Sequence, residues 1–402
     1  MIHIEIMRDD LVSAVKLAGE VTEGDVTASP ASRGDIAIIA SGTEVIVHGS
    51  DAIQAVWARR TAAVHEPGAF VIQAARARDF LSAFTKNEAV TIKAEPARGV
   101  CKLSQGKLRF APKIKEYTPS TLQRPTGKEF DVAITKRNLA ELVVAVSHAM
   151  SDAPESPNLR AIHFRSEDGR VRAAALNGRV LSVAHRPAEV RRPLDVLLPR
   201  QVVDVLAMVS SMGDGLVQIG IDASGRTHVH DGSDFAFSCS GLNIPFPDWR
   251  VAVPSVDGDP RKWPSYSMQI DRVAMLRTLK MASKVGDAVT MLPGKTALFT
   301  SSHDDRGIVV DELPSEFEGS TGEIGAVSVW SKYFCQALDG LTSKIVEVCG
   351  KGGEQPLILK PFDAEHVGAD GRSASDDIVI VMPIRTVDAD AARLQALVAK
   401  AT

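Results

Sequence analysis

Hydrophobic and polar residues repeat a strand-then-helix pattern three times along the chain. The alternating segment IHIEI (2–6) predicts a strand, and Leu11, Val15 and Leu17 follow at helical spacing. FDVAI (130–134) precedes a second such helix at 135–150, and YSMQI (266–270) precedes a third at 271–285. We therefore expect the same strand-helix step to open each of three units.

A second strand-helix step follows in each unit, at 70–84, 195–209 and 326–341. Matching residues of the first two units, such as Asp79 and Asp204, are separated by nearly the same distance as Leu11 and Leu139. A repeat of this period indicates one supersecondary plan used three times. The predicted fold class is α+β, with three similar domains.

Proline and turn residues collect in two joints, at 115–129 and 253–265. The predicted domains are therefore residues 1–125, 129–254 and 264–386, followed by an extension at 387–402. The sequence of the extension predicts a short helix, with Asp388 or Asp390 as its N-cap. Leu394, Leu397 and Val398 would lie on one face of this helix.

Composition narrows the class of protein. The chain has 402 residues, of which 45% are hydrophobic and 24% charged, enough for more than one core. Four cysteines, Cys101, Cys239, Cys335 and Cys349, lie far apart in sequence, so neither a disulfide framework nor a cysteine metal site is expected. The start lacks a signal-peptide pattern, and no apolar run of about 18 residues occurs. We expect a soluble, cytoplasmic protein.

The formal net charge of −4 argues against a protein whose whole surface grips nucleic acid. Any surface that faces DNA must therefore be segregated from the acidic remainder.

Several local signals for chemistry are incomplete. Gly294-Lys295-Thr296 resembles the end of a phosphate-binding loop, but Val289 stands where that loop needs glycine, so a turn between strands is expected. The glycine-rich segment 349–356 reads as a hairpin. His228 and His230 share a strand face but have no third ligand nearby in sequence. The sequence thus predicts no metal site, no cofactor and no enzyme, although a hydrolytic enzyme on repeated α+β domains, with a polar pocket, stays open.

Several segments, in the same order along residues 1–385, resemble the bacterial DNA polymerase III beta subunit, the beta sliding clamp. IVIVMPIR (378–385) is similar to the family's closing V-M-P-[MV]-R, and FPDWRVAVP (246–254) to its F-P-[DE]-Y-x-x-[VL]-[LI]-P. NLRAIHF (158–164), AALNGRVLSV (174–183) and LLPRQVVDVL (197–206) resemble three further family segments.

The chain departs from the family pattern near the expected peptide site. Leu176 to Val180 read LNGRV where the family has T-D-G-H-R, and Val251 stands where many relatives have arginine. The extension after Arg385 is expected close to this site, and whether it partly covers the site is left open by the sequence. A specialised clamp paralogue with altered partners is therefore an open alternative.

The resemblance implies a head-to-tail ring dimer whose helices line a pore and whose antiparallel sheets lie outside. Duplex DNA would pass through the pore without sequence specificity, because phosphates carry no sequence information. The alternative for any single cation is an ordinary solvated surface position. The residues expected to face DNA are Lys16, Arg76, Arg78, Lys136, Arg137, Arg200, Arg272, Arg277, Lys280, Lys284 and Lys332.

The resemblance also implies an apolar groove for extended peptides of the DNA polymerase III catalytic subunit, the clamp loader and other clamp-motif proteins. Its expected residues are Leu159, Leu176, Gly178, Arg179, Leu181, Pro247, Ile380, Val381, Met382, Pro383 and Ile384. Ordinary core packing is the alternative for each aliphatic member.

Ring closure in the family pairs edge strands of the first and third domains. Here the expected first-domain strand includes Lys107, Arg109 and Phe110, with Phe110 as the apolar anchor. Asp311 and Glu312 are the expected acidic partners.

Overall fold

The computed structural model describes residues 1–23, 34–51, 53–119, 124–125, 130–211, 213–255, 262–319, 324–363, 373, 375–386 and 388–401. Parts of both predicted joints, and residue 387 at the start of the predicted extension, therefore lie outside the described residues. For residues 398–401 only the backbone is described.

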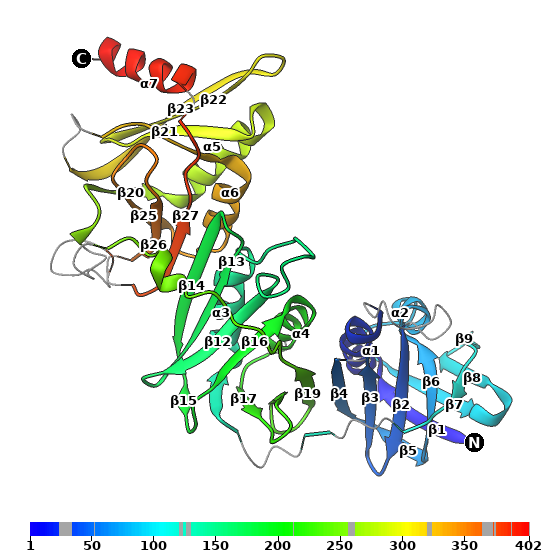
Figure 1. Ribbon diagram of the computed structural model, residues 1–402. Helices are drawn as coiled ribbons and strands as arrows, with labels where there is room; N and C mark the ends of the chain where they lie inside the picture. Colours follow the sequence, from blue (N-terminus) through cyan, green and yellow to red (C-terminus); the bar gives the residue numbers. More distant parts are fainter. Residues whose placement is uncertain are drawn as a thin grey trace. The chain divides into compact units, whose positions relative to one another are not determined.

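The order of the elements repeats three times along the chain (Figure 1). The first copy comprises β1 (Ile2–Met7), α1 (Arg8–Glu23), β2 (Asp35–Ser41), β3 (Glu44–Ser50), β4 (Gln54–Thr61), β5 (Ala63–Glu66), β6 (Gly68–Gln73), α2 (Ala74–Ser82), β7 (Ala89–Glu95), the 3₁₀ turn η1 (Pro96–Arg98), β8 (Val100–Gln105), β9 (Leu108–Phe110) and β10 (Lys115–Glu116).

The second copy follows the same plan. It comprises β11 (Val132–Thr135), α3 (Lys136–Ser147), β12 (Ala161–Glu167), β13 (Arg170–Leu176), β14 (Val180–Pro187), β15 (Glu189–Val190), β16 (Asp195–Pro199), α4 (Arg200–Ser210), β17 (Leu216–Ile221), β18 (Arg226–His230), β19 (Phe235–Ser240) and the 3₁₀ turn η2 (Trp249–Ala252).

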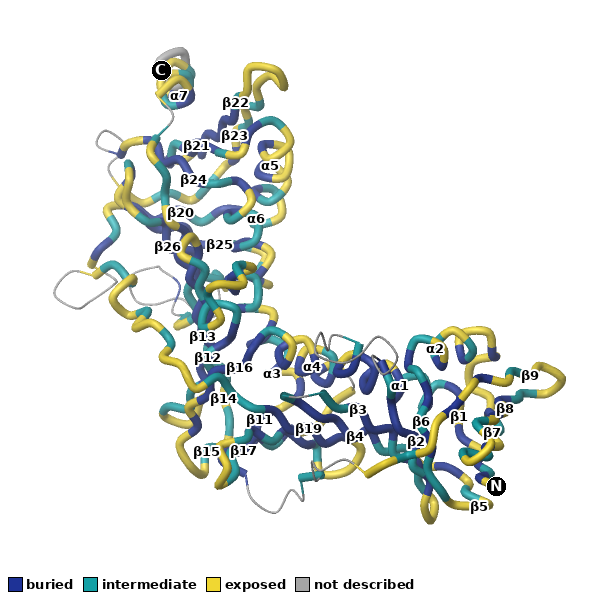
Figure 2. The backbone as a smooth tube through the Cα atoms, turned by 45° about the vertical axis from the view of Figure 1, so that its right-hand side comes forward, coloured by how far each residue is buried: buried dark blue, intermediate teal, exposed yellow. Residues whose placement is uncertain are grey.

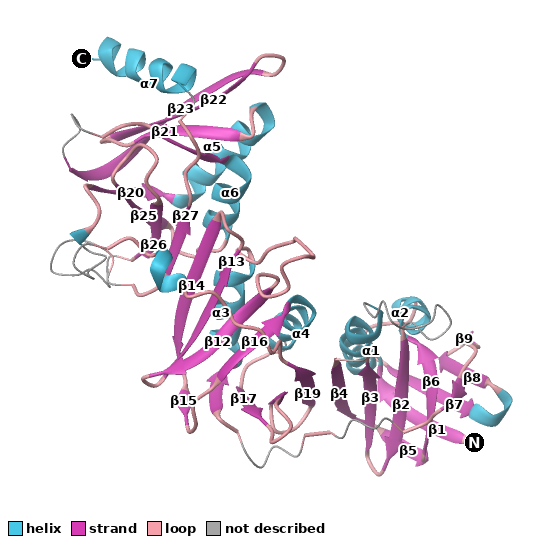
Figure 3. Cartoon of the chain, viewed as in Figure 1, coloured by secondary structure: helices cyan, strands magenta, loops and turns pink. Residues whose placement is uncertain are grey.

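The third copy comprises β20 (Tyr266–Asp271), α5 (Arg272–Val285), β21 (Ala288–Leu292), β22 (Thr296–His303), β23 (Gly307–Gly319), β24 (Val327–Trp330), α6 (Ser331–Asp339), β25 (Ile345–Gly350), β26 (Leu357–Phe362) and β27 (Ile378–Val381), and α7 (Asp388–Ala401) follows it. Helices and antiparallel strands thus alternate in blocks, which confirms the predicted α+β class (Figure 3). The predicted turn at 293–295 and the hairpin at 349–356 are also present.

Contacts within the chain define two compact units. One contains residues 1–140, 165–170 and 187–243, and the other contains residues 141–164, 171–186 and 244–402. The division passes through the middle copy of the repeat, so the three predicted domain boundaries stay a prediction.

In the first unit, α1 and α2 lie side by side, and α1 packs against β2, β3 and β4 (Figure 3). Asp9 and Asp10 in the first turn of α1 complement the positive end of its dipole, and Leu11, Val15 and Leu17 are buried as the sequence predicts. Gly49 on β3 meets the carbonyl oxygen of Ala18 so closely that a side chain there would clash with the helix.

Two sheets form the strand layers of the first unit. One has the order β5-β1-β7-β8-β9, and the other has the order β10-β6-β2-β3-β4-β19-β18-β17-β11-β15. The second sheet is continuous because β19 of the middle copy pairs antiparallel with β4 of the first copy, with Phe237 opposite Val56.

The second unit contains a sheet portion with the order β14-β27-β26-β25-β20-β23-β22-β21-β24. α5 and α6 pack together, and α5 packs against β21, β22 and β23. Asp271 caps α5, because its carboxylate accepts a 2.8 Å hydrogen bond from the backbone N–H of Ala274. Here too the last strand of one copy pairs with the preceding copy, with Leu181 of β14 opposite Ile380 of β27.

The C-terminal helix α7 packs against β21 and β22. Leu394 is fully buried, and the Asp390 carboxylate accepts hydrogen bonds from Ser302 and Arg393. The described part of the extension therefore lies on β21 and β22 rather than on β14 and β27, the strands that carry the expected groove residues Leu181 and Ile380.

Candidate functional site

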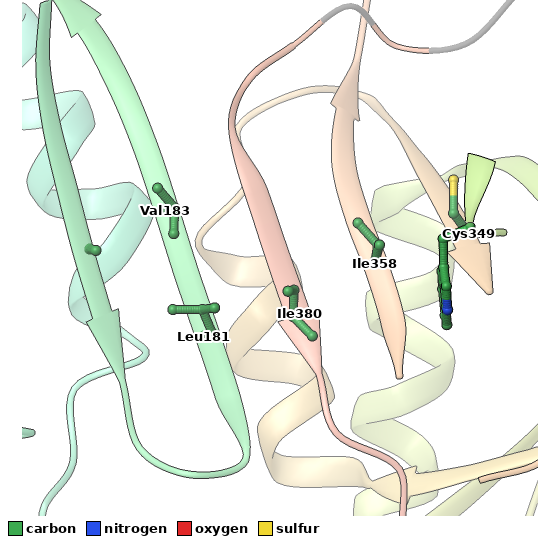
Figure 4. Packing of buried hydrophobic residues seen from close by; sticks show 7 residues of the cluster. Leu181, Val183, Cys349, Ile358 and Ile380 are labelled. Carbon is green, nitrogen blue, oxygen red and sulfur yellow. The ribbon is translucent and has the colours of Figure 1, made fainter. Parts of the chain in front are cut away.

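One face of the sheet in the second unit carries a continuous apolar cluster across four strands. Leu181 and Val183 of β14, Ile380 of β27, Ile358 of β26 and Cys349 of β25 belong to it, and all are buried (Figure 4). The intervening residue Ser182 points the other way, toward α3, where its hydroxyl donates to the carbonyl oxygen of Ala145. The apolar cluster therefore lies on the sheet face away from α3.

Aromatic residues that follow the middle copy cover this face. Trp263 is buried in the cluster, and Phe246 and Trp249 pack against it while partly exposed. The guanidinium carbons of Arg172 and Arg250 lie 5.3 and 5.2 Å from the ring centroid of Trp249. Both distances suit cation–π contacts, which hold the indole against the sheet.

The predicted groove residues divide into three groups. Leu176, Leu181 and Ile380 belong to the apolar cluster. Val381 is fully buried, and strand alternation places it on the opposite face from Ile380, so its side chain belongs to the helix-side core rather than to the predicted groove. The side chains of Leu159, Pro247, Pro383 and Ile384, together with Gly178, are exposed or partly exposed outside the buried cluster.

Arg179 and Met382 meet at the edge of the cluster. The Met382 backbone N–H donates a 2.8 Å hydrogen bond to the carbonyl oxygen of Arg179, and the Met382 residue is 39% exposed. Asn177 accepts from the backbone N–H groups of Arg179 and Val180, which shapes the turn between β13 and β14. The exposed Met382 therefore lies beside the turn between β13 and β14, which is held by Asn177 and carries the cation Arg179.

An ion-pair network fastens the strands from the helix side. Arg186 donates to Glu141 at 2.8 Å and to Asp377 at 2.6 Å, and Asp377 also accepts from the backbone N–H of His185. Arg186, Glu141 and Asp377 line a cavity with Ser182 and residues 340–342. Because both carboxylates bind the same guanidinium, Arg186 links α3 and the segment before β27 to β14, which is a structural role.

Two of the predicted DNA-facing cations serve the fold instead. Lys136 is 8% exposed and its ammonium lies 3.2 Å from the Asp231 carboxylate, so it does not belong to an exposed set. Arg272 is partly buried and donates to the carbonyl oxygens of Ser343 and Leu338, at the end of α6. Arg8 likewise donates to Leu81 near the end of α2. The sequence shows the charge of these residues but not the carbonyl or carboxylate that each one meets.

Other predicted cations remain at the surface of the helices. Arg78 is half-buried and pairs with Glu23 at 2.7 Å, and Lys280 lies 3.6 Å from Asp339. Arg200 is partly buried at the start of α4. α5 carries four cations and no acidic residue between Arg272 and Val285. The exposed members are Lys16, Arg76, Arg137, Arg277, Lys280, Lys284 and Lys332.

The predicted interface residues lie on two strand edges. Lys107, Arg109 and Phe110 lie on or beside β9, which ends its sheet, and Phe110 stacks on Phe80 with ring centroids 4.9 Å apart. Leu108 is 42% exposed.

Asp311 and Glu312 lie on the first part of β23. Residues 307–314 of β23 pair with β22, and residues 315–319 pair with β20. Among the described residues, the second edge of 307–313 has no paired strand, and Ile308 and Val310 there are 57% and 41% exposed. Figure 2 shows the region of β9 and the hairpin between β22 and β23 as exposed.

The sequence predicted no aromatic cover for the apolar face. Phe246 and Trp249 stand within the FPDWRVAVP segment, and Trp263 stands in a proline-rich joint. A large aromatic residue in such a joint is a usable signal, because tryptophan buries a large apolar area and is enriched at interfaces. Which strands it covers depends on long-range pairing.

Solved structures with the same fold are DNA polymerase sliding clamps. The chain matches the clamp from Bacillus subtilis with a TM-score of 0.80 and 18% identity, over 96% of this chain and 100% of that chain. It matches the beta subunit from Thermotoga maritima with a TM-score of 0.81 and 16% identity, over 96% and 100% of the two chains. It also matches the Pseudomonas aeruginosa clamp bound to griselimycin, at 0.80 and 18%, with the same coverage.

These likenesses show that the chain has the sliding-clamp fold. No protein-family model and no curated protein sequence matches it. At 14–18% identity to the solved clamps, it is a divergent version of this fold.

Replacing Asp231 tests the structural role of Lys136. Burial acts to raise the pKa of Asp231, but hydrogen bonds from the backbone N–H groups of Phe235 and Ser233, and from Lys136, outweigh it and hold the pKa below its usual value. Asp231→Asn removes the carboxylate that lies 3.2 Å from the buried Lys136 ammonium, so we expect the free energy of unfolding to fall by about 3 kcal/mol in urea denaturation.

The exposed neighbour Asp234 provides the matched control. Asp234→Asn should leave the urea midpoint unchanged, and Lys136→Met combined with Asp231→Asn should recover most of the loss, because the buried ammonium is then removed together with its carboxylate. Equal midpoints for the two single variants would contradict the role given to Lys136.

Proposed function

We propose that this protein is a sliding clamp, which encircles duplex DNA and tethers a replicative DNA polymerase and other proteins to it. The observation that carries the proposal is a strand junction that occurs twice in the chain. The last strand of the second copy pairs with β4 of the first, and the last strand of the third copy pairs with β14 of the second. By the same rule, within the part of the chain that the structure describes, β9 and the first part of β23 each have one unpaired edge.

A second copy of the chain supplies the missing partners. β9 ends the sheet β5-β1-β7-β8-β9 of the first copy, and β23 is the third strand after α5 in the third copy, as β4 is the third strand after α1 in the first. Pairing β9 of one chain with β23 of the other, twice, closes a head-to-tail ring of two chains. The charges are complementary, since Lys107 and Arg109 would face the strand of Asp311 and Glu312. Closure also removes exposed edges that otherwise favour aggregation.

In such a ring the helices face the DNA. α5 supplies the most concentrated positive charge, with Arg277, Lys280 and Lys284 all exposed. Contacts of this kind reach phosphates, so binding is salt-dependent and independent of base sequence. Retention then comes from the closed ring, and weak phosphate contacts leave it free to slide.

The apolar face around Leu176, Trp249 and Met382 is the proposed docking site for partner peptides. An exposed methionine beside branched aliphatic residues makes an adaptable surface that accepts more than one apolar side chain. The same place carries the departures from the beta-clamp pattern, LNGRV at 176–180 and Val251, which supports the alternative of a specialised clamp with altered partners.

A hydrolytic enzyme is less well supported. Its discriminating feature is a polar pocket with free, convergent carboxylates. In the cavity beside α3, the carboxylates of Glu141 and Asp377 are both bound to Arg186. We therefore propose a non-catalytic protein. A clamp that serves DNA replication would work in the cytoplasm.

Disrupting the unpaired edge of β23 tests ring closure. We expect Ile308→Asp to raise the dissociation constant of the dimer at least about tenfold, because burying an unpaired carboxylate costs more than about 1.4 kcal/mol. Sedimentation equilibrium of the full chain measures this constant. Leu216→Asp is the control, because Leu216 is 55% exposed on β17, outside both edges. A wild-type chain that stays monomeric, or equal constants for the two variants, would refute the proposed closure.

Charge reversal on α5 tests the DNA-facing surface. For Arg277→Glu with Lys284→Glu, we expect the slope of log retention against log salt on nicked circular DNA to fall by about two, one unit for each lost phosphate contact. Lys93→Glu with Lys102→Glu is the matched control, because these exposed residues face each other on β7 and β8. The control should keep the wild-type slope, and a similar fall in both double variants would remove α5 from the DNA surface.

Griselimycin, which is bound to the Pseudomonas aeruginosa clamp, provides a probe for the apolar face. We expect it to bind the wild-type chain in isothermal titration calorimetry, and Met382→Asp to weaken binding about tenfold or more, since a carboxylate would be desolvated against the apolar rim. Leu216→Asp should bind as the wild type does. If griselimycin binds the Met382→Asp variant as tightly as the wild type, the docking site lies elsewhere. If it binds neither the wild type nor the variant, the apolar face does not accept this ligand, and the result supports a specialised clamp with altered partners.

A further inference from the structure

We propose that His3, Glu5 and His65 form a binding site for a zinc ion on the exposed face of the first unit. The inference goes beyond the clamp function and does not depend on it. The three side chains offer two imidazole nitrogens and a carboxylate, a ligand set found in zinc sites that keep an open position. His65 is about sixty positions from His3 and Glu5 along the chain, so no local sequence motif predicts the site.

Two ligands come from one strand. His3 and Glu5 are two residues apart on β1, where the buried residues Ile2, Ile4 and Ile6 alternate with them. Alternation in a strand places residues two apart on the same face. His3 and Glu5 therefore both project from the solvent side of the sheet, opposite the core.

A β-bulge brings in the third ligand. β5 pairs with β1 at the edge of the sheet, and the register passes from His3 opposite Glu66 to Ile4 opposite Val64. His65 is thus the extra residue on β5, and a bulge of this kind re-aims the side chain that it carries. The imidazole of His65 turns toward the face that holds His3 and Glu5.

The distances are compatible with one shared ion. The ring centroids of His3 and His65 lie 4.5 Å apart, and His65 Nε2 lies 3.6 Å from Glu5 Oε1. One ligand atom from each of the three residues lies within 4.8 Å of the others. Around a tetrahedral zinc ion, with bonds of about 2.1 Å, ligand atoms lie about 3.4 Å apart. Small rotations of the exposed Glu5 and His65 side chains close that difference.

The surroundings set the character of the site. Three protein ligands leave at least one position for water, and the exposure of His65 and Glu5 gives the ion direct access. Lys93 on β7 stands opposite His3, and its positive charge weakens the binding of any cation. The site therefore suits a borderline divalent ion that favours imidazole, such as zinc, rather than magnesium or calcium, which need more oxygen ligands. A bound ion would clip β5 to β1 at the sheet edge.

Titration of the full chain with zinc chloride tests the proposal. After treatment with a chelator and desalting, we expect isothermal titration calorimetry to show a site of one zinc ion per chain. His65→Gln should weaken it more than about tenfold, because one of three ligands is lost. Glu5→Gln should weaken it as well. The apparent melting temperature of the wild type, but not of His65→Gln, should rise with zinc.

His303→Gln is the matched control, because it removes an exposed histidine on β22, far along the chain from the three ligands. It should bind zinc as tightly as the wild type. The melting temperatures of all variants without metal should agree, which separates lost ligation from lost folding. Unchanged zinc affinity in His65→Gln, or equal losses in His65→Gln and His303→Gln, would overturn the proposal.

Discussion

Pairing of strand edges is the constraint on which the structure depends. A strand at the edge of a sheet exposes a row of backbone donors and acceptors, and proteins pair, cover or charge such edges. Here the last strand of each later copy pairs with the copy before it, β19 with β4 and β27 with β14. Both junctions are therefore ordinary antiparallel ladders. The same rule leaves β9 and residues 307–313 of β23 as the edges that a second chain would complete.

The distribution of charge follows from what each cation can reach. Arg8 and Arg272 meet the carbonyl groups at the ends of neighbouring helices, and Lys136 meets Asp231, so these cations stabilise the fold. The other cations of α5, Arg277, Lys280 and Lys284, are exposed, and this helix contains no acidic residue. An acidic chain can in this way present a basic helical surface, which is the arrangement that the proposed clamp function requires.

Local periodicity predicted most of the fold. The strand-helix steps at 2–18, 130–150 and 266–285 lie where β1 and α1, β11 and α3, and β20 and α5 form, because each helix buries a regular apolar stripe. Leu181 and Ile380 were placed in one site through the family resemblance, and they are opposite each other in the β14–β27 ladder.

The remaining features depend on contacts between distant segments. Val381 was assigned to the groove, but strand alternation turns it to the core, and the partner of Lys136 lies 95 residues away. Trp263 covers strands that no local pattern connects to it, and His65 reaches His3 only through a bulge. Strand register and long-range pairing determine where these side chains lie, and neither can be predicted from a local sequence pattern.

The central claim is topological, so the most direct measurement compares closed and open DNA. The purified protein would be placed on nicked circular duplex by a clamp loader, and its retention followed before and after a single cut linearises the circle. The account predicts a complex that persists on the circle and is lost from the linear DNA by sliding off its ends. Dissociation at the same rate from both forms would contradict encirclement.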